Sequence, residues 1–426
     1  MPFCRLFFSL LLIFLAPVTY AQLPNQAFYN RFDKVDLNYA KERPSMGYDS
    51  ITNSRYIICY DARTPDWGYP SGNLELGTRT LGFFKDNEYF NKIADGYTLF
   101  GYQLQPSLKY YASEKIKLEA GVLLLKDFGN RKYRLIQPTF TAIYSTGKHT
   151  FLFGTLHGNL NFGYIEPLWD FERQLTTPIQ NGIQYKYDGN RFDFQTWVDW
   201  QVMQYAYDPK QEEIAGGFTG NLKGFFFKRT QLSFPLQFTA KHKGGQIDVN
   251  DHPLTTLFNG ATGFEITSHL SNWNDSLQQE SFLRNIYTKN YFVGYKDHSF
   301  THQFPFQGGS GIYLNAGADT RWANFMLSYW KGNGYISEFG GRLYQSVSTT
   351  VKNPGYIEKH RQLLILRIMK DWPILNADKT EYSGLTFTGR LEPFYDFRTG
   401  SVEFAAGLYL NFNTDFFLGK PKLRSR

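Results

Sequence analysis

The sequence predicts an all-β fold: a transmembrane antiparallel β-barrel of about sixteen strands, with fourteen or eighteen also possible. Aromatic residues make up 18% of the 426-residue chain, and this enrichment between regular turn residues indicates many strands. Beyond the N-terminus, no stretch approaches the ~20 apolar residues that a membrane-spanning helix needs. The mean hydropathy of −0.41 fits a barrel, because strands that alternate apolar and polar residues keep the average low.

Residues 1–21, "MPFCRLFFSLLLIFLAPVTYA", are expected to be a secretory signal peptide. Arg5 precedes an apolar run, and small residues at 19 and 21 form a cleavage site. The mature chain would keep one cysteine, Cys59, so it could form no internal disulfide. Loss of Arg5 would change the formal net charge from +7 to 7 − 1 = +6.

Residues 22–75 show little periodicity, and we expect an N-terminal extension, a plug or a first hairpin there. Within this segment "SRYIICYDART" (54–64) is compatible with one strand.

Residues 76–417 are predicted to form the barrel. The clearest strand is "SVEFAAGLYLNFN" (401–413), in which apolar residues at even positions alternate with Glu403, Tyr409 and Asn411. The same alternation predicts strands at 191–202, 230–241 and 384–397, among about sixteen in all.

Two features of these strands carry further expectations. Pro235 and Pro393 fall inside predicted strands, where proline is expected at a bulge or a strand end. Longer connections at 163–181, 207–213 and 297–311 are expected on one side of the barrel, opposite short turns.

The inferred inward faces carry polar residues of both charge signs, as expected of a water-filled lumen. The predicted lining residues are Lys117, Glu119, Asp193, Trp197, Asp199, Gln237, Arg390, Glu392 and Asp396. Trp197, between two aspartates, suits either a stacked sugar ring or a constriction filled by its own side chain.

The segment "GFEITSHLSNWNDS" (263–276) contains His269, Ser271 and Asn272. This His-x-Ser-Asn string is similar to one in outer-membrane phospholipase A and in the lipid A deacylases. The resemblance implies that Ser271 attacks an acyl ester, that His269 takes its proton, and that Asn285 orients the histidine from a neighbouring strand.

The direction of this strand supports a second interpretation of the motif. Phe264, Ile266 and Leu270 occupy one face, which belongs against lipid, and that places His269 and Ser271 in the lumen. In the enzymes that share the string, the active residues point outward. The alternative is therefore that these are lumen-lining polar residues.

Two other groups of polar residues are candidate metal sites. Glu166, Asp170 and Glu172 suit calcium by chemistry but lack a calcium-loop spacing, so a solvated loop with a Glu166–Arg173 pair is expected. The histidines of "HSFTH", His298 and His302, have no evident third ligand. We expect no metal and no cofactor.

The aromatic-rich last strand is followed by a basic tail (418–426), and it resembles the insertion signal of outer-membrane barrels. With the signal peptide and the strand rhythm, the chain resembles an uncharacterised family of large porin-like outer-membrane barrels of Gram-negative bacteria. The resemblance implies location in the bacterial outer membrane.

The leading functional hypothesis is a porin-like channel for passive diffusion of small hydrophilic solutes, narrowed by inward side chains and one infolded loop. The alternatives are an acyl-ester hydrolase using Ser271 and His269, and a non-transporting surface or assembly barrel. Expected partners are outer-membrane lipid and small hydrophilic solutes, and a homo-oligomer is possible. Nucleic acid is not expected, because the positive charges are dispersed.

Overall fold

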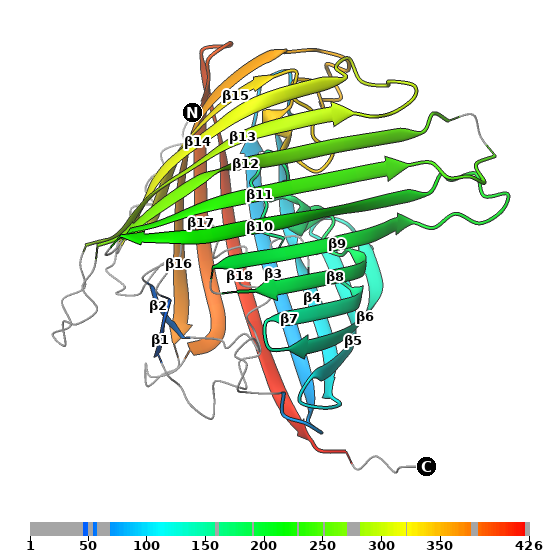
Figure 1. Cartoon of the computed structure of the whole chain (residues 1–426), viewed down its shortest axis with the longest axis vertical. Helices are drawn as coiled ribbons and strands as arrows, with labels where there is room; N and C mark the ends of the chain where they lie inside the picture. Colours follow the sequence, from blue (N-terminus) through cyan, green and yellow to red (C-terminus); the bar gives the residue numbers. More distant parts are fainter. Residues whose placement is uncertain are drawn as a thin grey trace.

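The computed structural model describes residues 46–49, 54–57, 69–157, 162–189, 191–227, 230–249, 252–270, 282–320, 322–375 and 382–421. In these residues, sixteen antiparallel strands, β3 to β18, pair in sequence order and close into one barrel. Figure 1 shows β3 and β18 side by side where the sheet closes. The predicted fold class and strand number are confirmed.

The strands have these bounds: β3 (Leu74–Glu88), β4 (Tyr97–Tyr111), β5 (Ile116–Asp127), β6 (Leu135–Thr146), β7 (His149–Thr155), β8 (Asn181–Asp188), β9 (Phe192–Val202), β10 (Glu213–Phe227), β11 (Thr230–Lys243), β12 (Thr255–His269), β13 (Leu283–Asp297), β14 (Gly308–Thr320), β15 (Asn324–Asn333), β16 (His360–Leu375), β17 (Tyr382–Asp396) and β18 (Ser401–Gly419). Helical structure in the described chain comprises α4 (Arg173–Thr176) and the 3₁₀ turn η1 (Arg342–Tyr344). None of these described helices is long and apolar enough to span a membrane.

In the N-terminal segment, β1 (Met46–Asp49) pairs with β2 (Ser54–Ile57) in a separate two-stranded sheet. β2 begins the stretch in which one strand was expected. The predicted signal peptide lies outside the described residues.

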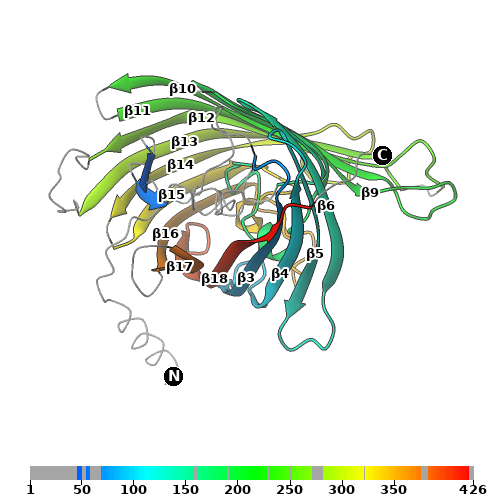
Figure 2. The same ribbon diagram turned by 90° about the horizontal axis from the view of Figure 1, so that it is seen from below.

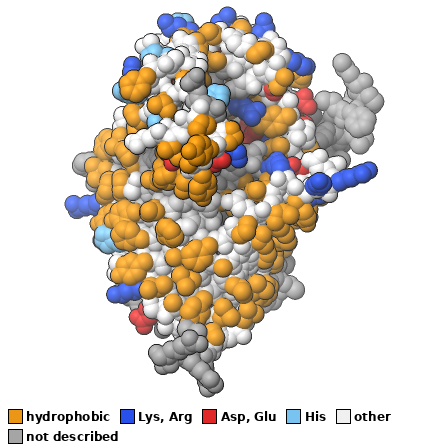
Figure 3. All heavy atoms as spheres, turned by 90° about the vertical axis from the view of Figure 1, so that its right-hand side faces the viewer, with side chains coloured by type: hydrophobic (Ala, Val, Ile, Leu, Met, Phe, Trp, Pro, Cys, Tyr) orange, Lys and Arg blue, Asp and Glu red, His pale blue; other side chains and the backbone are white. Residues whose placement is uncertain are grey.

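Alternation along the strands separates a lipid face from a lumen face. On β18, Val402 is 71% exposed and Phe404 and Leu408 are also exposed, whereas Glu403 is 3% exposed and Asn411 is buried. Hydrophobic side chains cover much of the exterior seen in Figure 3. This apolar outside around a polar wall is the pattern of a barrel that spans lipid.

The two prolines are accommodated differently from the expectation. Pro235 lies within β11 and Pro393 within β17, and no register shift accompanies either one. Instead, pairing with one neighbour lapses: the β11–β12 ladder resumes at Leu236, and the β16–β17 ladder lacks pairs at Pro393. Proline removes a donor without adding a residue, so a gap in one ladder suffices.

The connections separate the barrel into two different ends. Segments 156–180, 203–212, 298–307 and 334–359 lie at one end, called here the long-loop end. The other, called the short-turn end, has brief turns such as 112–115 and holds the first and last residues of the barrel. The predicted clustering of the longer connections is confirmed.

Two of the long connections fold into the lumen, where one was expected. Tyr164 of loop 156–180 donates a hydrogen bond to the Phe238 carbonyl on β11 (2.9 Å). From the wall, Asn259 donates to the Ile336 carbonyl of loop 334–359 (2.6 Å). Figure 2 shows these segments inside the ring of strands.

An aromatic core forms where the two loops meet the wall. Phe162 stacks on Trp197 of β9 with ring centroids 4.5 Å apart, and Trp169 lies against Phe339 of the other loop at 5.0 Å. Part of the lumen is therefore packed like a protein interior.

Candidate functional site: a charged cluster in the lumen

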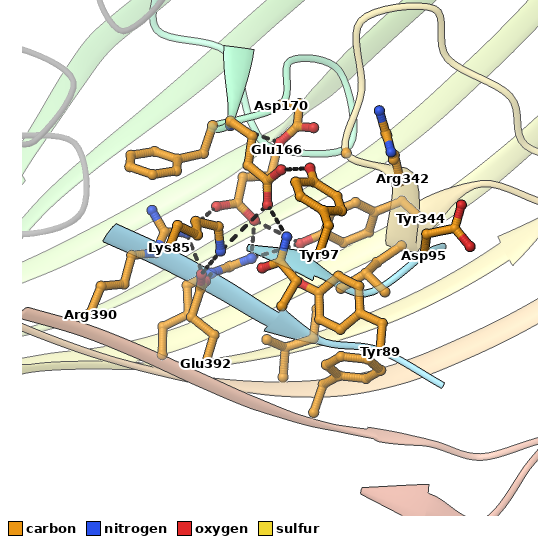
Figure 4. A pocket seen from close by; sticks show the side chains of 18 residues that line it. Lys85, Tyr89, Asp95, Tyr97, Glu166, Asp170, Arg342, Tyr344, Arg390 and Glu392 are labelled. Carbon is orange, nitrogen blue, oxygen red and sulfur yellow. Dashed lines mark hydrogen bonds and ion pairs between the residues drawn. The ribbon is translucent and has the colours of Figure 1, made fainter. Parts of the chain in front are cut away.

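Charged side chains from the wall and from loop 156–180 meet beside the aromatic core. Figure 4 shows Lys85, Glu166, Arg390 and Glu392 converging on one small space. We call this group the charged cluster; it comprises Lys85 (β3), Arg367 (β16), Arg390 and Glu392 (β17), and the loop residues Glu166 and Glu172. Each of these side chains is at most 11% exposed.

Glu166 ties the loop to strands β16 and β17. Arg390 donates to its Oε1 at 2.6 Å, and Arg367 donates to its Oε2. Tyr344 of loop 334–359 donates to the same Oε2 at 2.9 Å. One loop carboxylate thus receives hydrogen bonds from two wall guanidinium groups and from the second loop.

Glu172 makes a second attachment to strands β3 and β4. Asn87 donates to its Oε1 at 2.7 Å, and Tyr97 donates to its Oε2. The Lys85 ammonium lies 3.5 Å from the same carboxylate. The loop is therefore held to the wall on both sides of β18, at β17 and at β3.

The wall carries an excess of positive charge that the loop neutralises. Lys85, Arg367 and Arg390 contribute +3, and Glu392 contributes −1, so the wall part of the cluster carries 3 − 1 = +2. Glu166 and Glu172 contribute −2. Buried charge needs such compensation, because unpaired ions are costly to remove from water.

A cavity of about 50 Å³ remains among these residues. At about 10–15 Å³ per water centre, it holds a few waters and no solute of sugar size. Arg390 lines it and is buried, and its Nε and Nη1 atoms have no hydrogen-bond partner among the described residues. Asp170 of the loop also lines it, and burial raises the pKa of that carboxyl above its usual range.

The expectation of a solvated acidic loop is wrong. Glu166 does not pair with Arg173, because it is bound by Arg367 and Arg390. The Arg173 guanidinium instead lies over the rings of Trp169 and Phe339, at 4.8 and 4.9 Å. The loop enters the lumen, where its carboxylates meet the basic wall rather than water.

Of the predicted lining residues, Arg390 and Glu392 belong to the charged cluster. Lys117 and Glu119 form a separate ion pair at 3.0 Å, and Asp396 pairs with Arg361 at 3.0 Å. The side chains of both pairs are buried.

The other predicted lining residues hold the structure together elsewhere in the lumen. Gln237 accepts a hydrogen bond from the Ile165 amide (3.0 Å), and Asp199 accepts one from the Asn181 amide (2.8 Å). Asp193 pairs with Lys223.

Trp197 is buried in the aromatic core. Its ring stacks on Phe162, and its Nε1 donates to the Tyr164 hydroxyl at 3.0 Å. Between the two roles considered for Trp197, the observed contacts are those of a side chain that fills the lumen.

Sequence reasoning missed Lys85, Arg367, Asn87, Tyr97 and Tyr344. On β16 the inward neighbours of Arg367, Ile365 and Met369, are apolar and pack against residues of the infolded loops. Both faces of β16 are therefore apolar around Arg367, and the alternation that marks a lumen face is lost there.

His269, the first residue of the His-x-Ser-Asn motif, is the last residue of β12 and lies at the short-turn end. His269 pairs with Asn285 of the neighbouring strand β13. Asn285 is buried and donates to Asp319 at 3.0 Å. The side chain of His269 and the whole of Ser271 lie outside the described residues, and their catalytic role stays a prediction.

The histidines considered for metal binding are separated by their contacts. His298 packs on Phe258 with ring centroids 5.0 Å apart, and the Nδ1 atom of His302 lies 3.1 Å from Asp297. In the described part of the chain, no three His, Cys, Asp or Glu side chains are grouped so that they could hold a metal ion.

A family model described as "Lipid A 3'-O-deacylase-type" matches residues 62–421. No curated protein matches the sequence. Among solved structures, the chain is similar to the outer membrane protein OprD from Pseudomonas aeruginosa, with 9% identity and a TM-score of 0.47 over 84% of this chain and 97% of that one. It is also similar to OccAB4 of Acinetobacter baumannii (9% identity, TM-score 0.46, 82% and 99% covered) and to OprB of Pseudomonas putida (9%, 0.44, 81% and 94%).

The closed barrel with its apolar exterior is of the bacterial outer-membrane type. The protein is therefore located in the bacterial outer membrane, and its barrel is porin-like in architecture.

Proposed function

The chain belongs to the lipid A 3'-O-deacylase-type family, and from this membership and its porin-like barrel we propose a function in the outer membrane. The barrel acts as a channel for passive diffusion of small hydrophilic solutes. Its lumen is narrowed by loops 156–180 and 334–359, and displacement of loop 156–180 widens the passage.

The single observation that carries this proposal is the polar attachment of loop 156–180 to the wall. A permanent plug is stabilised most simply by apolar packing, whereas buried ion pairs contribute little net stability. Loop 156–180 packs apolar side chains in the aromatic core, but at β3, β16 and β17 it also meets the wall through the buried carboxylates of Glu166 and Glu172. Such groups can exchange their partners for water when the loop moves, so the attachment suits a reversible closure.

Liposome swelling tests the channel. Purified full-length protein in liposomes should admit a small neutral solute such as glycerol or arabinose faster than a bulky one such as stachyose. Liposomes without protein supply the baseline. Swelling no faster than this baseline for every solute, with the barrel shown to be folded by circular dichroism, would favour a non-transporting barrel instead.

The family match favours a second function, an acyl-ester hydrolase acting on lipid A or phospholipid. The candidate residues are Ser271 as nucleophile, His269 as base and Asn285 as orienting group. The strand ends that hold His269 and Asn285 lie opposite the long loops, and the cavity at the charged cluster has no histidine, serine, threonine or cysteine among its described lining residues. For these reasons the channel is the first proposal.

The hydrolase is tested by fatty-acid release from lipid A and from phospholipid, comparing the natural protein with Ser271→Ala. A large loss of release in the variant supports the hydrolase. The same release in both proteins, or none in either, removes Ser271 from consideration.

A further inference from the structure

We propose that the charged cluster is a binding site for a small dianionic solute, a dicarboxylate or a phosphate. The solute's anionic oxygens would replace the carboxylates of Glu166 and Glu172 on the basic wall. This inference rests on the proposed channel, since it names the class of solute that the lumen recognises.

The first argument is the charge of the wall. Without the loop carboxylates, Lys85, Arg367, Arg390 and Glu392 carry +2 on the lumen wall. This net charge attracts an anion and repels a cation. A solute with two negative charges restores the neutrality that Glu166 and Glu172 now supply.

The second argument is the shape of the donor set. Two guanidinium groups from adjacent strands, Arg367 and Arg390, point at the same carboxylate. Planar forked donors of this kind match carboxylate and phosphate oxygens in two-point contact. The donors to Glu172, Asn87 and Tyr97, also line the cavity and provide for a second anionic group.

The third argument is that Arg390 has hydrogen-bond donors that its described neighbours do not use. Arg390 is 5% exposed and lines the cavity, yet its Nε and Nη1 atoms have no hydrogen-bond partner among the described residues. Buried donors normally have partners, so these two donors indicate a ligand or water at this place. Arg390 therefore has donors available for a second acceptor besides Glu166 and Glu392.

These three features make Glu166 and Glu172 internal competitors for the anion. A solute need not fit into the present 50 Å³, because it takes over the space of the two carboxylates as loop 156–180 withdraws. The exchange replaces one set of charge-assisted hydrogen bonds by another of the same kind, so its free-energy change is small and the binding reversible.

Binding is measured on the full-length protein in detergent, by titration calorimetry and by the emission of tryptophan, since Trp169 belongs to the loop. The probes are succinate, inorganic phosphate and, as the neutral control, erythritol, all at an ionic strength fixed with sodium chloride. Saturable binding of succinate or phosphate but not of erythritol is expected. The two anion arms separate carboxylate from phosphate recognition.

Variants distinguish a binding site from a merely structural ion-pair cluster. Arg390→Gln should weaken anion binding at least tenfold, and Arg390→Lys, which keeps the charge but not the fork, should weaken it less. Glu166→Gln should tighten binding severalfold, because a competitor is removed. Glu265→Gln changes another inward carboxylate, one bound to Tyr291 on β13, and should leave the affinity unchanged.

The proposal is overturned if neither anion binds saturably, or if binding is the same in Arg390→Gln, or if Glu166→Gln weakens it. Because binding is measured without transport, the outcomes stay separate. A protein that passes neutral solutes but binds no dianion keeps the channel and loses this site. One that binds a dianion but passes nothing keeps the site and loses the channel.

Discussion

At the scale of single residues, Asp170 is buried beside the charged cluster, and the free-energy cost of burying its carboxyl group depends on pH. Its pKa is raised by burial, so the charged form is disfavoured in the folded protein. The carboxyl therefore favours folding while it is protonated, and this contribution is lost as pH rises through the raised pKa. Its Oδ1 accepts the Glu172 amide at 2.9 Å, an acceptor role that an asparagine retains.

Asp170→Asn should consequently raise the midpoint of thermal unfolding at pH 7.5, and by less at pH 4.5, where a larger fraction of the aspartate is protonated. Differential scanning calorimetry at the two pH values measures the difference. An advantage of the variant that is equal at both values, or larger at pH 4.5, would count against the buried carboxyl.

Trp197 is the residue whose loss should cost the most stability. It is 1% exposed and stacked on Phe162, so Trp197→Ala leaves a cavity in the aromatic core and should lower the free energy of unfolding by about 3–5 kcal/mol. Trp200 lies on the same strand but is 42% exposed on the outer face, and Trp200→Ala should cost clearly less. Denaturant unfolding in lipid vesicles compares the two, and equal losses would contradict an interior core.

At the scale of elements, the close approach of the two infolded loops depends on Gly340. A Cβ atom at this position would lie 2.0 Å from the Pro167 carbonyl oxygen of loop 156–180, so neither backbone can stay where it is. Gly340→Ala should therefore loosen the closure and speed the swelling of liposomes in arabinose severalfold.

The matched control for this variant is Gly294→Ala on β13, where an added Cβ meets nothing within 4 Å. It should swell at the natural rate. A Gly340→Ala protein that is folded and no faster than the control would show that the contact between the loops does not limit passage.

Strands were predictable from sequence where one face meets lipid and the other meets water or polar neighbours. β17 and β18 are of this kind, and Arg390 and Glu392 were found because most inward residues of β17 are polar. The lumen face of β16 could not be predicted in this way, because the residues around Arg367 are apolar on both faces. The loop contacts could not be predicted, since Glu166 and Arg367 are 201 residues apart and no periodicity links them.

At the scale of the whole molecule, the number of strands and their closure follow from local patterns, but the state of the lumen does not. A sixteen-stranded barrel is wide enough for an aqueous channel. Here the loops bring apolar and charged side chains into that space, and a cavity of about 50 Å³ lies among the residues of the charged cluster. The central claim is that loop 156–180 narrows the lumen and is held there by a charged attachment that can open.

Single-channel recording in planar bilayers tests this claim most directly, comparing the natural protein with the double variant Glu166→Gln, Glu172→Gln. The substitutions keep the size of both side chains and remove the two charges that hold loop 156–180 to the wall. The natural protein should be mostly closed with small, brief openings, and the variant should stay open longer at a conductance several times higher. The same conductance and open time in both proteins would contradict the account.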